Sequence, residues 1–139
     1  MGYESKVFIV EHYTFIKDFE GNLLDNPIHS AIVVAEYDLS KMGYDNSEFY
    51  KVFKKEIDYK LWMLSCDDDG NEIGMDVDTD CYGEHMKSAD IGELIEVLKR
   101  CEAREHYRRI PPLIAMLEAF KLDEWNNAHC TLEAVHYGY

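Results

Sequence analysis

The pattern of apolar and polar residues divides the first part of the chain into two strands. Residues 5–16 (SKVFIVEHYTFI) alternate in part and are rich in β-branched and aromatic types, which predicts a strand. Residues 29–39 contain an apolar run that predicts a second strand, buried on both faces. The turn-forming sequences DFEGN and DNP lie between them. We therefore expect an antiparallel pair joined by a connection of about a dozen residues.

The middle of the chain predicts a helix followed by a hairpin. Ser47 can cap a helix in which Phe49, Phe53 and Ile57 recur at helical spacing. Residues 58–65 predict a strand, and residues 72–80 can return beside it after the turn sequence DDDGN.

Two further helices and a closing strand follow. Asp90 and Glu93 can form a capping box for a helix with one apolar stripe, made of Ile91, Leu94, Ile95 and Leu98. Pro111 and Pro112 end the helical pattern near residue 109, and Pro112 suits the first turn of a new helix. The predicted buried face of that helix consists of Leu113, Met116, Leu117 and Phe120. Residues 131–139 alternate and predict a last strand.

Together these elements predict one α+β domain over residues 1–139, with an antiparallel sheet of about five strands and about three helices. The length of 139 residues and the 47% of hydrophobic residues suit a single folded core. No apolar run has the length of a membrane span, and the first residues lack a signal-peptide pattern. We therefore expect a cytoplasmic protein. Its four cysteines form no CxxC pair, so we expect reduced thiols.

The charge of the chain is strongly acidic and unevenly distributed. The net charge is −14, from 28 acidic and 14 basic residues, which argues against direct binding of nucleic acid. The same charge suits a basic protein surface as partner, including a groove that otherwise holds nucleic acid. The partner-binding residues that we predict lie in one acidic segment without Lys or Arg: Asp67, Asp68, Asp69, Glu72, Asp76 and Asp78.

The segment DVDTDCYGEHM, residues 76–86, has the residue types of a zinc site. Cys81 and His85 are common zinc ligands, and a turn at Gly83 lets both approach one ion. Asp80 or Asp78 can add a carboxylate. We prefer His106 as the remote ligand, because the bend before the proline pair can point it toward this turn; the alternatives are Cys66, Cys101 and His136.

The basic segment REHYRRI offers a second kind of site. Arg104, Tyr107, Arg108 and Arg109 can bind the phosphate of a small ligand through bidentate hydrogen bonds. Alternatively, these arginines pair with the excess of carboxylates within the protein. We prefer internal pairing.

Enzyme signatures are missing from the sequence. It contains no nucleophile elbow, Walker loop or HExxH motif. Cys81 and His85 could act as a thiolate and its base, and the acidic cluster could supply carboxylates to a metal-dependent hydrolase. We nevertheless expect a protein that is not an enzyme, and keep ligand binding and then hydrolysis as alternatives to a role in protein interaction.

The order of several segments resembles a group of small uncharacterised proteins from phages and prophages of Gram-positive bacteria. These segments are GYESKVFIVE, KMGYDN, KEIDYKL, DTDCYGEHMKSA, REHYRRIPPL and VHYGY. In size and charge the chain also resembles phage-encoded anti-CRISPR inhibitors of type II systems. That resemblance implies an inhibitor in the cytoplasm of a bacterial host, which binds a Cas effector nuclease and blocks nucleic-acid loading. One such inhibitor class holds a structural metal, which suits Cys81 and His85.

The zinc hypothesis predicts a measurable metal content. Protein purified without a histidine tag should contain about one equivalent of zinc, and chelation should lower its melting temperature, because binding of a structural metal contributes to folding. Cys81→Ala should lose the metal and melt at a lower temperature. Elemental analysis that finds less than about a tenth of an equivalent, with melting unchanged in chelator, would contradict the hypothesis.

Overall fold

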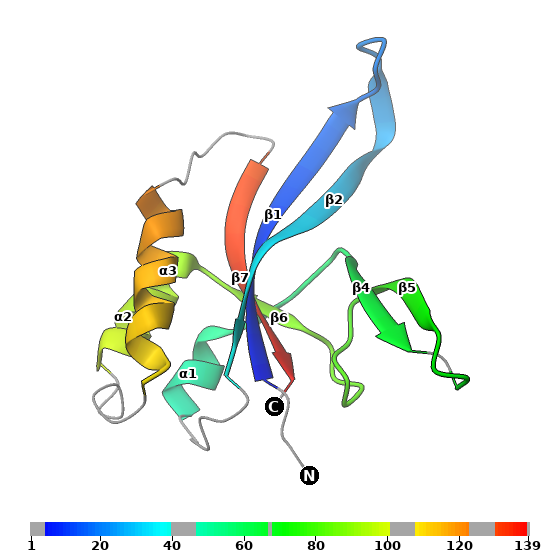
Figure 1. The fold of residues 1–139 in the computed structure, drawn as a ribbon. Helices are drawn as coiled ribbons and strands as arrows, with labels where there is room; N and C mark the ends of the chain where they lie inside the picture. The colour runs from blue at the N-terminus through cyan, green and yellow to red at the C-terminus, as the bar shows by residue number, and fades with distance from the viewer. Residues whose placement is uncertain (1–4, 40–46, 67, 101–107, 123–129, 139) are drawn as a thin grey trace.

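The structure is an α+β fold in which a five-stranded antiparallel sheet carries helices on one face (Figure 1). A computed structural model of the chain describes residues 5–39, 47–66, 68–100, 108–122 and 130–138. Within these residues the predicted fold class, a small α+β domain with three helices, is confirmed. The elements in chain order are β1 (Ser5–Lys17), β2 (Leu23–Asp38), α1 (Ser47–Val52), β3 (Lys55–Glu56), β4 (Leu61–Cys66), β5 (Glu72–Val77), β6 (Lys87–Ala89), α2 (Ile91–Arg100), α3 (Ile110–Leu122) and β7 (Cys130–Gly138).

Strand β1 lies between the two other long strands of the sheet. The strand order is β2-β1-β7-β6-β3, and β4 with β5 forms a separate two-stranded sheet. The pairing of β1 with β7 runs from Ser5 opposite Gly138 to Tyr13 opposite Cys130. Beyond Tyr13, β2 is the one strand of the described residues that continues beside β1, and the end of this hairpin projects from the sheet (Figure 1).

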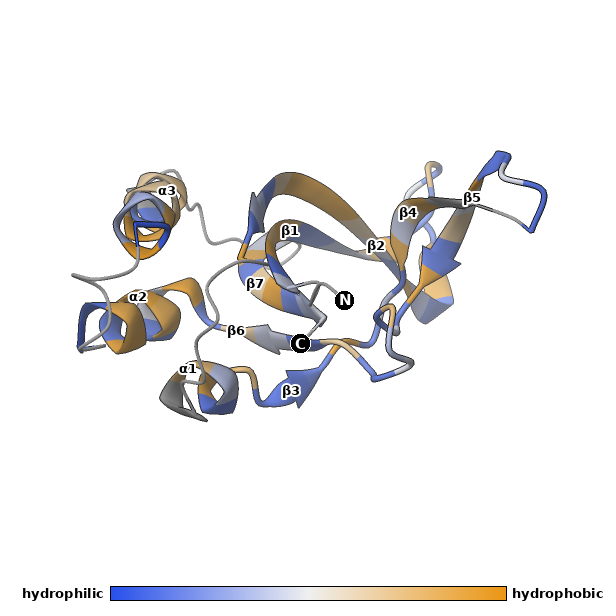
Figure 2. Cartoon of the chain, turned by 60° about the horizontal axis from the view of Figure 1, so that its bottom comes forward, coloured by the Kyte–Doolittle hydropathy of each residue, from blue (hydrophilic) through white to orange (hydrophobic). Residues whose placement is uncertain are grey.

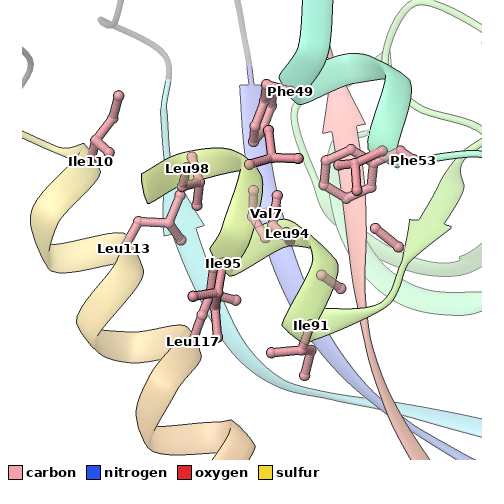
Figure 3. Close-up of a cluster of buried hydrophobic side chains, with 14 of the residues drawn as sticks. Val7, Phe49, Phe53, Ile91, Leu94, Ile95, Leu98, Ile110, Leu113 and Leu117 are labelled. Atoms are coloured by element: carbon pink, nitrogen blue, oxygen red, sulfur yellow. The ribbon is translucent and has the colours of Figure 1, made fainter. Parts of the chain in front are cut away.

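The helices cover the face of the sheet to which Val7 and Ile9 point. Both side chains are fully buried in a cluster with residues of all three helices. In Figure 3, Leu94, Ile95 and Leu98 of α2 lie between α3 and the sheet. The cluster is completed by fully buried side chains of α3, namely Ile110, Leu113 and Leu117. These contacts explain the apolar stripe that the sequence shows in α2.

A second cluster covers the opposite face of the same strand. Phe8 and Val10 are buried there. They pack against residues from the connection between β3 and β4, the first residue of β4, the residue before β6 and the middle of β7: Ile57, Tyr59, Leu61, Met86 and Val135. From Val7 to Val10, strand β1 is therefore buried on both faces.

A β-bulge lets the edge strand β2 contribute to both clusters. Ile9 pairs with Ala35, but Val10 pairs with Val33, so Val34 is an extra residue in β2. Ala35 packs against the helix-side cluster, and Val33 packs against the second cluster. The bulge therefore switches the face to which the following residues of β2 point.

Several local predictions are confirmed in detail. Asp90 caps α2, because its Oδ2 accepts a hydrogen bond from the Glu93 N–H at an N···O distance of 3.0 Å, which is one of the two bonds of the predicted capping box. Pro111 and Pro112 lie in the first turn of α3. The closing strand is β7, and the predicted hairpin is β4 with β5.

Other local predictions are wrong. The β1–β2 connection is residues 18–22 and not about a dozen residues, because β2 already begins at Leu23 and includes Pro27. Proline is tolerated there because β2 is an edge strand. Helix α1 ends at Val52, so Ile57 lies beyond it and packs in the second cluster. The two short strands β3 and β6, which complete the main sheet, were not predicted.

His136 of β7 lies among aromatic rings on the helix side of the sheet. The rings of Phe49, Tyr50 and Phe53 have centroids 5.7, 5.3 and 5.5 Å from its imidazole. Its Nε2 is 2.9 Å from Ser5 Oγ. Burial lowers the pKa of His136 to about 4. The folded protein therefore holds this imidazole neutral.

This lowered pKa predicts a pH dependence of stability. Between pH 6.5 and about 4 the unfolded chain binds a proton at His136 that the folded protein does not, so stability is lost as the pH falls through this window. The contribution amounts to at most about 3 kcal/mol. Urea unfolding of wild type and His136→Phe should show a shallower pH dependence for the variant. Equal slopes for the two proteins would contradict this assignment.

Candidate functional site

The segment that contains the predicted zinc ligands is a tight turn built around Asp80. Asp80 Oδ1 accepts hydrogen bonds from the N–H groups of Tyr82 and Glu84, at 2.8 and 3.0 Å. The Asp80 N–H donates to the Glu84 carbonyl at 2.8 Å, and the Gly83 N–H donates to the Asp80 carbonyl at 3.1 Å. Gly83 has φ of 82°, a conformation that favours glycine.

The β1–β2 hairpin has the same turn, built around Asp18. Asp18 Oδ1 accepts from the N–H groups of Glu20 and Asn22, each at 2.9 Å, and Gly21 has φ of 86°. The β4–β5 turn shares the Asp-x-x-Gly spacing, with Gly70 at φ of 84°, although its aspartate, Asp67, lies outside the described residues. DFEGN, DDDGN and DCYGE are thus three copies of one sequence pattern. This repeated spacing is a signal that was available in the sequence.

Three of the four predicted zinc ligands, Asp80, Cys81 and His85, lie in or next to the turn at Asp80. Cys81 is exposed on the turn, and His85 Nε2 lies 3.0 Å from the Ile57 carbonyl oxygen, so the ring nitrogen that remains for a metal is Nδ1. A similar hydrogen bond orients histidines that bind metals. His106 lies outside the described residues. Within the described residues no three His, Cys, Asp or Glu side chains are grouped to hold a metal, and the zinc site stays a prediction.

The predicted partner-binding acids lie on and beside the β4–β5 hairpin. Asp68, Asp69, Glu72 and Asp76 are exposed, while Asp78 is half-buried at the end of the hairpin. This hairpin stands apart from the five-stranded sheet, and the tip between its strands is hydrophilic (Figure 2). The acidic side chains are therefore accessible to a large partner.

Exposed apolar side chains accompany these acids on one face of the hairpin. Trp62 pairs with Asp76 and Leu64 pairs with Gly74, so these four residues share a face. Trp62 is 63% exposed and Leu64 is 68% exposed. The opposite face carries Leu61, which is fully buried in the second cluster. One face of the hairpin therefore attaches it to the core, and the other faces outward.

In the described part of the predicted anion site, Arg109 forms its contacts within the protein. Arg109 Nη1 donates to the Asp38 carbonyl oxygen at 2.7 Å and is 3.6 Å from Asp38 Oδ2. The Tyr37 hydroxyl donates to the Arg109 carbonyl oxygen at 2.5 Å. Arg108 is exposed, and Arg104 and Tyr107 lie outside the described residues. The geometry at Arg109 is that of internal pairing.

A polar cluster that was not predicted lies where the second core cluster meets the projecting hairpin. The Tyr59 hydroxyl donates to Glu133 Oε1, and its ring centroid is 4.5 Å from that of His12. His12 Nε2 is 3.1 Å from His29 Nδ1. Burial, followed by the hydrogen bond to Glu133, raises the pKa of Tyr59, and burial lowers the pKa of His12. No local pattern could reveal this cluster, because it needs the pairing of β1 with β2 and β7 and the packing of Tyr59 from the connection between β3 and β4.

Comparisons of the chain with protein-family models, with curated proteins and with solved structures gave no match. None of the helices that the structure describes is both long and apolar enough to cross a membrane.

The repeated turn provides a matched test of the role of Asp80. Asp80→Asn should keep the turn, because the amide oxygen can accept the same hydrogen bonds, whereas Asp80→Ala should destabilise the fold by about 1 kcal/mol. Asp18→Asn and Asp18→Ala are the controls at a turn without candidate metal ligands. Urea unfolding should give the same pattern at both positions. A loss in Asp80→Asn that Asp18→Asn does not show would instead assign a charge-dependent role to Asp80.

Proposed function

We propose that this chain is an interaction protein that binds a basic surface of a partner protein through the β4–β5 hairpin. The observation that carries the proposal is the charge of one exposed element. From Leu61 to Val77, the span of this hairpin, the sequence contains five acidic residues and no Lys or Arg. Among the described residues of the hairpin, Asp68, Asp69, Glu72 and Asp76 are exposed.

Electrostatics gives this hairpin two roles in binding. The net charge of −14 attracts a basic partner over long distances and raises the rate of encounter. Carboxylates on a projecting hairpin can then pair with Lys and Arg side chains that otherwise contact phosphates. The hairpin thereby competes with nucleic acid for the same basic surface.

The partner class follows from the resemblance to phage inhibitors. A Cas effector nuclease of a type II system has a basic channel for nucleic acid, and an acidic protein that occupies it blocks nucleic-acid loading. The role proposed for the chain is therefore that of an anti-CRISPR inhibitor acting inside a bacterial host. It requires no catalytic group in the chain. A structural zinc at the turn of Asp80, Cys81 and His85 is compatible with it.

Binding and cleavage assays with purified type II effectors test this function. The chain should bind the effector and protect target DNA at molar excess, and affinity should fall by about tenfold or more between about 50 and about 300 mM salt, because exposed charges are screened. Neutralising three hairpin acids should weaken binding by about tenfold or more, since each removes a charge-assisted contact. These substitutions are Asp68→Asn, Asp69→Asn and Glu72→Gln.

The control protein carries the same change in net charge elsewhere, in Glu20→Gln, Asp25→Asn and Glu96→Gln, at exposed positions outside the β4–β5 hairpin. It should retain most of the affinity. Full DNA cleavage at molar excess, without detectable binding to any type II effector, would refute the inhibitor role. Equal losses in the two triple variants would refute the hairpin as the binding element.

A further inference from the structure

The indole ring of Trp62 covers a glycine on the neighbouring strand. A Cβ atom built on Gly74 would lie 1.9 Å from Cζ2 of Trp62, and 2.5 and 2.7 Å from two further ring atoms. Glycine is thus the residue that leaves room for the ring in this position. One side of the indole rests on the backbone of β5, while the side chain as a whole is 63% exposed. The ring therefore presents an aromatic surface outward.

Carboxylates share the outward face with this ring. Asp76 is the direct cross-strand partner of Trp62, which places their Cβ atoms about 5 Å apart. Glu72 lies two residues from Gly74 along β5 and points to the same face. Both acids are exposed, and the sequence places no Lys or Arg between Leu61 and Met86. The hairpin itself therefore supplies no countercharge for these two acids.

We infer that the outward face of the β4–β5 hairpin binds arginine side chains of the partner, with the guanidinium stacked on Trp62 and hydrogen-bonded to Asp76 or Glu72. This inference rests on the proposed function and specifies which basic residue the hairpin selects. A guanidinium is planar and weakly hydrated, so it can stack on an aromatic ring while its N–H groups reach a carboxylate. A lysine ammonium is compact and strongly hydrated, and it gains less from the same surface.

Charge complementarity favours this occupant over other candidates for an exposed apolar face. A second copy of the chain would bring another net charge of −14 to a face that already carries Asp76 and Glu72. A purely apolar partner segment would desolvate these carboxylates without hydrogen-bonding to them, which is unfavourable. An arginine supplies an apolar stem for Leu64, a planar cation for Trp62 and donors for the acids.

Two basic peptides of equal length and equal charge test the inference, one carrying arginine and the other lysine at the same positions. Calorimetric titration at about 50 mM salt should show at least about fivefold tighter binding of the arginine peptide. Trp62→Ala should remove this preference while retaining the weaker, salt-dependent binding of both peptides. Asp76→Asn should reduce the affinity for arginine more than that for lysine.

Two further variants test whether the arginine preference depends on the position of the indole ring or on the net charge alone. Gly74→Val keeps Trp62 in the sequence but places a Cβ where the indole lies, so it should lose the arginine preference as Trp62→Ala does. Glu20→Gln changes the net charge by the same amount as Asp76→Asn, on the other hairpin, and should keep the preference. Melting curves check that each variant is folded.

The possible results bear separately on the arginine preference and on the proposed binding of a basic partner. Equal affinity of wild type for the two peptides, or an arginine preference that persists in Trp62→Ala, would overturn the inference and leave the proposed binding of a basic partner intact. Failure of both peptides and of the type II effectors to bind at low salt would overturn the proposed function as well.

Discussion

The structure depends on burying both faces of β1. The side chains of Val7 and Ile9 point to one side of the sheet, and those of Phe8 and Val10 point to the other. All four are essentially inaccessible to solvent. The helices bury Val7 and Ile9 on the first face. The second face is covered by irregular chain around Tyr59 and by the adjoining end of the β4–β5 hairpin, with Leu61 fully buried. Because Leu61 packs in this second cluster, burial of the second face of β1 also positions the base of the acidic β4–β5 hairpin.

The hairpin combines a fixed base with an outward face free of basic residues. Its inner side joins the second cluster, while Trp62 and Leu64 remain outside although both are large and apolar. Aromatic residues are enriched at protein interfaces. This contrast supports a binding role more directly than net charge does, because charge alone also serves solubility.

Local signals allowed much of the fold to be predicted, whereas features made by long-range pairing could not be. The Asp90 cap of α2 and the proline pair at the start of α3 depend on a few adjacent residues, and both are confirmed. The strand β6 has only three residues and is held by β7 and β3, so nothing in its own sequence marks it. For the candidate site, the exposure of the acidic residues of the β4–β5 hairpin could be predicted, because charged side chains seldom lie in a core. The position of Trp62 over Gly74 required the register of two strands, and the role of Asp80 in the turn required recognition that one spacing occurs three times.

The pairing of β1 with β7 also sets the order in which the chain can fold. Hairpins closed by short turns form within microseconds, but Ser5 can pair with Gly138 only after the residues between them have been synthesised. Until then β1 has β2 on one edge and an open edge on the other, next to the most apolar stretch of the sheet. An unpaired strand edge favours aggregation, and the acidic residues that follow this hairpin in the sequence add a repulsive charge that opposes self-association.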